Sequence, residues 1–343
     1  MTTRQKFLLP FLCLLLLISV PAAAAFGSVK ISLLEVGRII CSPLNLNTEA
    51  VNLVHSDIIW LLRLPRIILA ACIGGGLSVC GVVMQALVRN PLADPYILGI
   101  SSGASLGATL AILLGAGSVF GAYSTGMAAA AGAFAAALGV LLLANTGGRA
   151  GSVKLLLAGM AMSALCSAFV SFVVYCAHDK DGIQTVTYWL MGSLANARWQ
   201  SLAVICPLFM AGSIFFTLQS RILNLMLVGD ETAITLGTDL QRYRKLYLII
   251  VAVIVGFAVY AAGIIGFVGL VIPHIFRTLI GTEHKMLIVA VALGGAVFLV
   301  WADVLCRIIL PGAELPIGVL VSLIGAPCFI YLMLRRNYEF GGN

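Results

Sequence analysis

Three arginines border apolar stretches of the chain, at positions 63, 66 and 307. A guanidinium group binds a carboxylate through two parallel hydrogen bonds, so Arg63 and Arg66, three residues apart, are suited to hold an acidic partner in one pose. Arginine also anchors a protein at the membrane surface, with its aliphatic stem in lipid and its charge at the headgroups. For Arg63, Arg66 and Arg307, spacing alone leaves carboxylate docking and headgroup anchoring both open.

Two common catalytic motifs are absent from the sequence. There is no G-x-x-x-x-G-K-[ST] loop for nucleotide phosphates and no H-E-x-x-H helix. The four histidines are scattered; for His274 a local hydrogen bond is the expected role, and metal ligation is the alternative. None of the nine cysteines forms a C-x-x-C pair, and most lie in apolar runs, where cysteine behaves as a small hydrophobe. We therefore predict that the chain is not an enzyme and has no catalytic residue, metal site or cofactor.

The composition requires lipid as the main solvent. Hydrophobic residues make up 61% of the 343 positions and charged residues 10%, and the mean hydropathy is +1.10. Soluble domains carry about 25% charged residues, so this chain lacks the charge for a water-exposed surface. The formal net charge of +7 comes from basic residues in short loops, where they act as topology signals, so no nucleic-acid partner is expected.

Ten apolar runs are long enough to cross a bilayer, which needs about 20 residues per helix. We predict an all-α integral membrane protein with one transmembrane domain over residues 1–343 and a tight surface turn over residues 260–263. An even number of spans puts both termini on one side. The ten runs cover residues 7–26, 67–88, 96–114, 119–143, 154–177, 201–218, 246–262, 263–280, 286–302 and 316–334.

Charge asymmetry orients these spans. With both termini in the cytoplasm, 13 of the 20 basic residues fall on the inner side, among them Arg149 and Arg336. Four of the remaining 7 lie in one long outer segment, where the positive-inside rule has less force. We therefore predict cytoplasmic termini. Residues 1–26 fit either a cleaved signal peptide or a retained first span, and the many later spans favour retention.

Charged residues are scarce inside the predicted spans. Lys154, Arg277 and Asp303 lie near span ends, where they are expected to snorkel to the surface. Ion-coupled transporters usually carry an ionisable group within the membrane, so energy for uphill transport is expected from a separate subunit. The inner segment 219–245 is the expected docking surface. It contains a predicted short helix over residues 229–241, capped by Asp230 or Thr232 and stopped at Gly237.

Small residues recur every four positions in two of the spans. One set is Gly99, Gly103 and Gly107, and the other is Ala128, Gly132 and Ala136. Small residues at this spacing let helices approach closely in lipid. We expect these sets to serve packing within the chain.

Several strings, in order, resemble the FecCD family, the permease subunits of type II ABC importers for iron–siderophores, haem and vitamin B12. The resemblance runs from about residue 30 to residue 336. It rests on residues 63–66 (RLPR), 74–76 (GGG), 84–87 (MQAL), 89–95 (RNPLADP), 98–104 (LGISSGA), 266–274 (GFVGLVIPH), 314–318 (ELPIG) and 325–327 (GAP).

The resemblance implies ten helices per subunit, two subunits around one pathway, and three sets of functional residues. Family arginines at matching positions receive glutamates of a substrate-binding protein, and a short inner helix couples to the ATPase; for that helix, a loop helix lying on the membrane is the alternative. The implied residues are Arg63, Arg66 and Arg307 for docking, Gly229, Glu231, Ala233, Leu236 and Gly237 for coupling, and Asn90, Leu92, Ser152 and Val153 for a cytoplasmic gate.

Two further implications concern the pathway. Its walls should come from residues 96–114, 154–177, 263–280 and 316–334. A short helix within residues 178–200 should cap the outer mouth, although Tyr188, Trp189 and Trp199 suit an interfacial aromatic belt equally well. Asn90-Pro91 is also a turn signal, so a structural role competes with the gate.

The implied function is a permease of the prokaryotic cell membrane that imports an iron–siderophore, haem or cobalamin-type chelate by alternating access. Its expected partners are two copies of a cytoplasmic ATP-binding subunit, an extracytoplasmic substrate-binding protein, a second permease subunit forming a homodimer, and the lipid membrane. The alternatives are a self-sufficient secondary transporter or channel and, more remotely, a membrane-embedded enzyme. Nothing in the residues selects one chelate.

Overall fold

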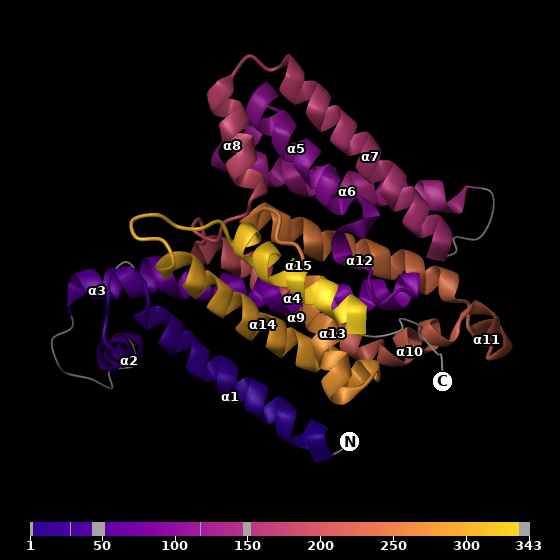
Figure 1. Cartoon of the computed structure of the whole chain (residues 1–343), viewed down its shortest axis with the longest axis horizontal. Coiled ribbons are helices and arrows are strands. Elements are labelled where there is room, and N and C mark those ends of the chain that lie inside the picture. Colours follow the sequence, from indigo (N-terminus) through magenta and orange to yellow (C-terminus); the bar gives the residue numbers. More distant parts are fainter. Residues whose placement is uncertain (1–2, 28, 43–51, 117, 147–151, 336–343) are drawn as a thin grey trace.

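A computed structural model describes residues 3–27, 29–42, 52–116, 118–146 and 152–335, and every regular element in these ranges is helical (Figure 1). Arg149 and Arg336, which are predicted to lie on the inner side, fall outside these ranges. The elements are α1 (Thr3–Ala25), α2 (Leu33–Cys41), α3 (Leu53–Asp57), a π-helical stretch (Ile58–Arg63), α4 (Leu64–Val88), a 3₁₀ turn (Pro95–Leu98), α5 (Ile100–Leu114), a 3₁₀ segment (Ser118–Tyr123), α6 (Ser124–Asn145), α7 (Ser152–Cys176), α8 (Lys180–Leu190), α9 (Trp199–Leu218), α10 (Ser220–Val228), α11 (Asp230–Thr235), α12 (Leu240–Ala262), α13 (Val268–Ile280), α14 (His284–Ile308) and α15 (Ile317–Arg335).

A helix lies over each of the ten apolar runs. Within the described residues, seven helical stretches are long and apolar enough to cross a membrane, the longest being residues 53–88, which joins α3, the π-helical stretch and α4. Three shorter apolar helices, α5, α13 and α15, cover the other runs.

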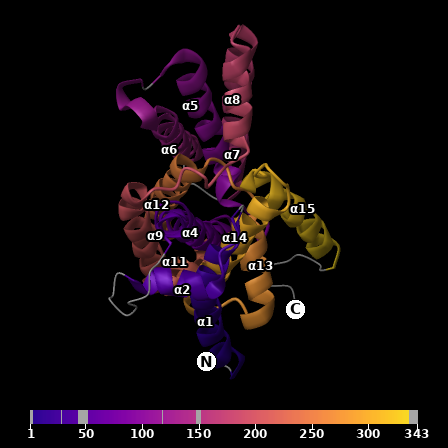
Figure 2. The same cartoon turned by 90° about the vertical axis from the view of Figure 1, so that its left-hand side faces the viewer.

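Helix α4 is the centre of the bundle. It packs against α9, α12, α13 and α14, which surround it in Figure 2. Close approach depends on glycine: a Cβ at Gly74 would lie 2.2 Å from the Gly295 carbonyl oxygen in α14, and one at Gly81 would lie 1.8 Å from that of Gly269 in α13. These helices therefore meet backbone to backbone, as small residues allow in lipid.

Helices α5 and α6 pack by the same device. A Cβ at Gly103 would lie 2.4 Å from the Gly132 carbonyl oxygen, and one at Gly107 would lie 2.1 Å from that of Ala128. The packing role predicted for both small-residue sets is therefore confirmed. Together with α7 and α8, these helices form a group beside the α4 bundle, to which α6 is joined through α12 (Figure 1).

Helix α1 lies along α14 and is tied to it. Trp301 Nε1 donates a hydrogen bond to Ser19 Oγ at 2.9 Å, and Ala23 and Ala24 are fully buried. The carbonyl of Ala24 accepts a hydrogen bond from Arg63 at 2.5 Å. Helix α1 is therefore packed into the bundle through its C-terminal half.

Two local predictions were wrong. The turn after α12 begins at Gly263 (φ 69°), not at Tyr260, which lies within the helix. It is not at a free surface, because a Cβ at Gly263 would lie 2.7 Å from the Trp189 carbonyl oxygen. The inner short helix spans six residues, and its N-cap is Gly229 rather than Asp230 or Thr232, because the Asp230 carboxylate binds Arg244 instead. Its predicted stop is confirmed, since Gly237 has φ 76° just beyond the helix.

Candidate functional site

Two of the three predicted docking arginines, Arg66 and Arg307, bind one buried carboxylate, Asp303, for which this role was not predicted. Arg66 Nε donates to Asp303 Oδ1 at 2.7 Å, and Arg307 Nε lies 3.1 Å from Asp303 Oδ2. The Asp303 side chain is 1% exposed, so it does not snorkel to the surface as predicted. Burial is tolerated because two guanidinium groups offset the desolvation of the carboxylate.

Arg66 also binds a second carboxylate, on the loop between α14 and α15. Its Nη1 donates to Glu314 Oε2 at 2.8 Å and to Oε1 at 3.1 Å. Glu314 is 51% exposed, whereas Arg66 is 11% exposed. The outward edge of the cluster is therefore an acidic side chain that water reaches, and an incoming carboxylate would have to displace it.

Arg63 and Arg307 connect the cluster to the end of α1. Arg63 donates from Nη1 to Ala24 and from Nη2 to Val29, both backbone carbonyls, and Arg307 Nη1 donates to the Phe26 carbonyl at 2.8 Å. The structure thus brings the three arginines together, but it directs their donors into the chain. The i,i+4 spacing of Asp303 and Arg307 was the available sequence signal for part of this arrangement.

The predicted coupling residues cluster in and beside α11, at the opposite end of the bundle. Ala233 is the one buried residue of α11, whereas Glu231 and Leu236 are exposed, Leu236 by 67%. Among the described residues, no heavy atom lies within 4 Å of the place that a Cβ at Gly237 would take. This short helix therefore presents most of its surface outward, as a protein-docking element would.

One buried cation fixes α11 to α12. Arg244 Nη2 donates to Asp230 Oδ1 at 2.6 Å and Nη1 donates to Oδ2 at 2.9 Å. Such bidentate pairing fixes both the position and the orientation of the Asp230 carboxylate relative to α12. The Arg244 side chain is 2% exposed, so the cationic partner of this ion pair is buried in the protein.

The end of α4 also reaches this segment. Arg89 has φ 55°, and its Nη1 would lie 3.2 Å from a Cβ at Gly229. Gly229 itself has φ 117°, a value that side chains other than glycine rarely adopt. The start of α11 is therefore pinned between α4 and α12.

The predicted gate residues lie at this same end. Asn90 Oδ1 accepts from the Leu92 backbone N–H at 2.9 Å, which makes the turn that Asn90-Pro91 signalled. Ser152 Oγ, at the start of α7, donates to the Leu87 carbonyl at 3.4 Å, and Val153 is exposed. The two gate segments are therefore adjacent.

Asp94 closes the turn after α4. Its Oδ1 accepts from the Tyr96 N–H at 2.8 Å. Burial raises the pKa of Asp94 to about 6, although this hydrogen bond opposes the shift. The pKa of this carboxyl is therefore brought close to the range in which pH varies in cells.

The segment after α8 joins two helix ends. The Ser193 N–H donates to the Ala262 carbonyl at 2.8 Å, and the Gly318 N–H donates to the Met191 carbonyl at 3.0 Å. Gly192 adopts φ 74° between them. Helix α8 is thereby fastened to the end of α12 and to the start of α15.

Two other histidines are engaged locally. His55 Nδ1 lies 2.5 Å from Glu35 Oε1, and His284 Nδ1 lies 2.5 Å from Asn224 Oδ1. In the described ranges, no three His, Cys, Asp or Glu residues are grouped as metal ligands would be.

Comparison with known proteins identifies the family. The FecCD transport family matches residues 13–335. The hemin transport system permease protein HmuU of Yersinia pestis is 38% identical, covering 99% of this chain and 98% of its own. The cobalamin import system permease protein BtuC of Halobacterium salinarum is 41% identical over 82% of this chain and 74% of its own.

A solved structure supports the same assignment. It is an inward-facing conformation of a metal-chelate type ABC transporter, with a TM-score of 0.84 and 33% identity, covering 96% of this chain and 99% of that one. The family match covers most of the chain, and the relatives match at more than 30% identity over most of their length. This chain belongs to the FecCD transport family.

Proposed function

We propose that the chain is the permease subunit of an ATP-binding cassette importer that moves a metal chelate of the haem, cobalamin or ferric siderophore type into the cytoplasm by alternating access. Two copies of a separate ATPase subunit drive it, and an extracytoplasmic binding protein delivers the cargo. The permease acts as a homodimer in a prokaryotic cell membrane. Family membership and the named substrates of the relatives support this proposal.

The observation that carries the proposal is the geometry of α11. A six-residue helix with one buried residue is exposed on most of its surface, yet a buried bidentate ion pair anchors it to a long apolar helix. A loop helix that rested on lipid would need no such anchor. A helix that transmits force from an ATPase to the membrane does need one.

The topology in this proposal has ten spans with both termini in the cytoplasm. Seven long and three shorter apolar helices in the described ranges supply the spans. Contacts between residues assigned to the same side of the membrane agree with this topology. Arg66 contacts Glu314 at the proposed outer end of the bundle, and Arg89 lies near Gly229 at the proposed inner end. The charge asymmetry of the sequence orients the two ends.

We assign the second permease copy to the exposed apolar sides of α7 and α15. Helix α7 buries Leu155, Ala158, Gly159 and Cys166 among its 25 residues, and its other apolar side chains are largely exposed. Helix α15 likewise exposes Leu323, Ile330 and Leu334. These faces, with α5 and α13, would enclose the pathway.

Uptake by membrane vesicles tests the function. Right-side-out vesicles that contain the chain with its ATPase and binding protein should accumulate at least one of haem, cobalamin and a ferric siderophore only when ATP is inside. Lys285→Gln, at an exposed position outside the 219–245 segment, is a suitable control variant. Uptake that survives ATP depletion and follows an ion gradient would support the alternative, a self-sufficient secondary transporter.

A further inference from the structure

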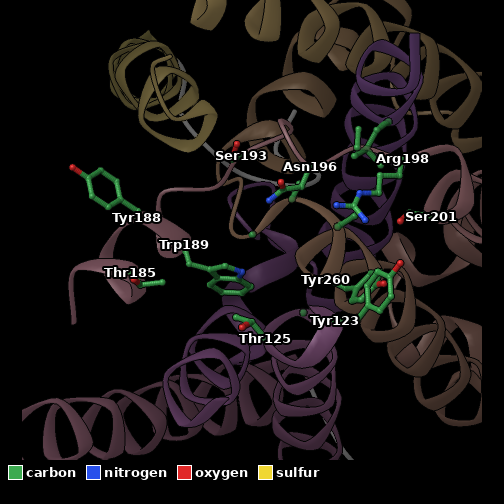
Figure 3. A pocket seen from close by; sticks show the side chains of 16 residues that line it. Tyr123, Thr125, Thr185, Tyr188, Trp189, Ser193, Asn196, Arg198, Ser201 and Tyr260 are labelled. Atoms are coloured by element: carbon green, nitrogen blue, oxygen red, sulfur yellow. The ribbon is translucent and has the colours of Figure 1, made fainter. Parts of the chain in front are cut away.

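A cavity of about 560 Å³ lies among the ends of α6, α8, α9 and α12 (Figure 3). It adjoins the segment that fastens α8 to α12, at the end of the bundle where Glu314 and the start of α15 are found. Its volume is in the range of small-ligand sites, about 300–1,000 Å³. The docking, coupling and gate residues do not line it.

Hydrogen-bond donors dominate the polar lining. Figure 3 shows the side chains of Trp189, from α8, and of Asn196 and Arg198, from the segment between α8 and α9, at the cavity. Within the described part of the chain, the guanidinium, amide and indole N–H groups of these three have no protein acceptor. The described residues of the lining include one cation, Arg198, and no Asp or Glu. A cavity with one positive charge and several unused donors is suited to an anion.

Aromatic side chains form the rest of the wall. Tyr123, Tyr188 and Tyr260 line it together with Trp189. Tyr and Trp concentrate at the boundary between lipid tails and water, because one end of each side chain is apolar and the other is polar. The cavity therefore lies at the depth where headgroups meet the protein.

Apolar surface continues from the cavity along two helices. Met127 on α6 is next to the lining residue Gly126, and Val204 on α9 follows the lining residue Ser201 by one turn; both Met127 and Val204 are exposed. Helix α12 contacts both α6 and α9, and the three lie on one side of the bundle in Figure 2. An occupant with an anionic head and apolar tails would match the cavity and these helices together.

We propose that this cavity binds the phosphate-bearing headgroup of a phospholipid from the outer leaflet. Arg198 and Asn196 bind the phosphate, the Trp189 N–H donates to a headgroup oxygen, and the acyl chains follow the exposed faces of α6 and α9. The proposal rests on the membrane topology and is independent of the cargo and of the ATPase. The lipid would stabilise the junction between the α5–α8 group and the α4 bundle.

Native mass spectrometry of the purified full-length protein tests this site. The protein is released from nanodiscs of 3:1 phosphatidylethanolamine and phosphatidylglycerol, and the retained lipids are counted. Wild type should retain one phospholipid per chain. Arg198→Gln should lower its apparent affinity roughly tenfold to a hundredfold, because a charge-assisted contact is lost. Trp189→Phe should lower it less, and Arg221→Gln, an exposed arginine at the opposite end, should leave it unchanged.

Three outcomes would overturn the proposal. The first is equal lipid retention by wild type and Arg198→Gln when both have the same melting temperature. The second is competition by inorganic phosphate as effective as that by dihexanoyl phosphatidylglycerol, which would make the cavity a free-anion site. The third is a cavity closed by a second copy of the chain, seen as protection of Arg198 that appears with dimer formation and needs no lipid.

Discussion

The guanidinium group of Arg244 in α12 holds both carboxylate oxygens of Asp230 in α11, at 2.6 and 2.9 Å. Arg244 is 2% exposed and Asp230 is 43% exposed, so the pair links a buried helix to a surface helix. We therefore expect α12 to move together with α11 when α11 is displaced. Helix α12 runs from this inner end to Ala262, which accepts a hydrogen bond from Ser193 at the other end.

Asp230→Ala should separate ATP hydrolysis from uptake. The variant leaves Arg244 buried without its counter-charge, a loss of about 3–5 kcal/mol for a fully buried pair and less here because Asp230 is half-exposed. We expect a lower melting temperature, retained ATP hydrolysis and strongly reduced uptake. Assays of ATP hydrolysis and of uptake in the same proteoliposomes measure the number of cargo molecules moved per ATP hydrolysed.

The double variant Asp230→Ala/Arg244→Leu is the matched control. It removes the buried charge together with its partner, so it should recover much of the stability but not the coupling. Recovery of uptake along with stability would mean that the ion pair serves folding alone.

Leu236→Glu should disturb docking without disturbing the fold. Leu236 is 67% exposed and lies at the end of α11, so a charge there has no buried contact to break. The melting temperature should stay within about 1 °C, since exposed substitutions change stability by less than ~0.5 kcal/mol. ATP-driven uptake should fall at least tenfold, whereas Leu236→Met should retain it. Normal uptake by the Glu variant would exclude α11 as the coupling helix.

The outer arginines call for a variant that spares the buried cluster. Glutamate at both Arg63 and Arg66 should abolish uptake, but these changes would also place like charges beside Asp303 and release the end of α1. Glu314→Gln is sharper, because Glu314 is half-exposed and its ion pair is worth about 0–1 kcal/mol.

If a carboxylate of the binding protein displaces Glu314 from Arg66, then Glu314→Gln should tighten docking several-fold with an unchanged melting temperature. Surface plasmon resonance with the binding protein measures the affinity, and Glu283→Gln, a carboxylate variant at the opposite end, is the control. Weaker docking would mean that Glu314 itself contacts the partner. Unchanged docking would mean that Arg66 serves only the fold.

Asp94 gives the fold a defined pH dependence. Its pKa of about 6 lies above the value near 3.9 in an unfolded chain. The native state therefore binds more protons between about pH 4 and pH 6, so the Asp94 contribution to stability falls as the pH rises through this window and is level above it.

Asp94→Asn keeps the acceptor for the Tyr96 N–H and removes the ionisation. The variant should be more stable than wild type at pH 7.5 by about 1–3 kcal/mol, and the difference should shrink toward pH 4.5. Thermal unfolding of both proteins across this range measures it. A difference that does not change with pH would contradict the raised pKa.

The apolar helices were predictable because each run is long and carries at most one charged residue. The glycine and alanine repeats likewise predicted where α5 and α6 pack, since small residues have one dominant use in lipid. Family resemblance selected the three arginines, and the structure brings them together.

What escaped prediction depends on contacts between distant segments. Asp303 looked like a snorkelling residue near a span end, and only the position of α4 beside α14 gives it Arg66 as a partner. Asp230 has the residue type of an N-cap, but Arg244 in the next helix outcompetes the backbone for its carboxylate. The turn at Gly263 is covered by residues 189–192, which the local sequence does not reveal.

The central claim is that a separate ATPase drives this chain through α11. The most direct test is to purify the tagged chain from its native membrane, identify the retained proteins by mass spectrometry, and repeat the purification with Leu236→Glu. The account predicts an ATPase with a Walker motif at one copy per permease chain, lost or strongly reduced in the variant. Recovery of the chain alone, still moving solute in ATP-free vesicles, would contradict it.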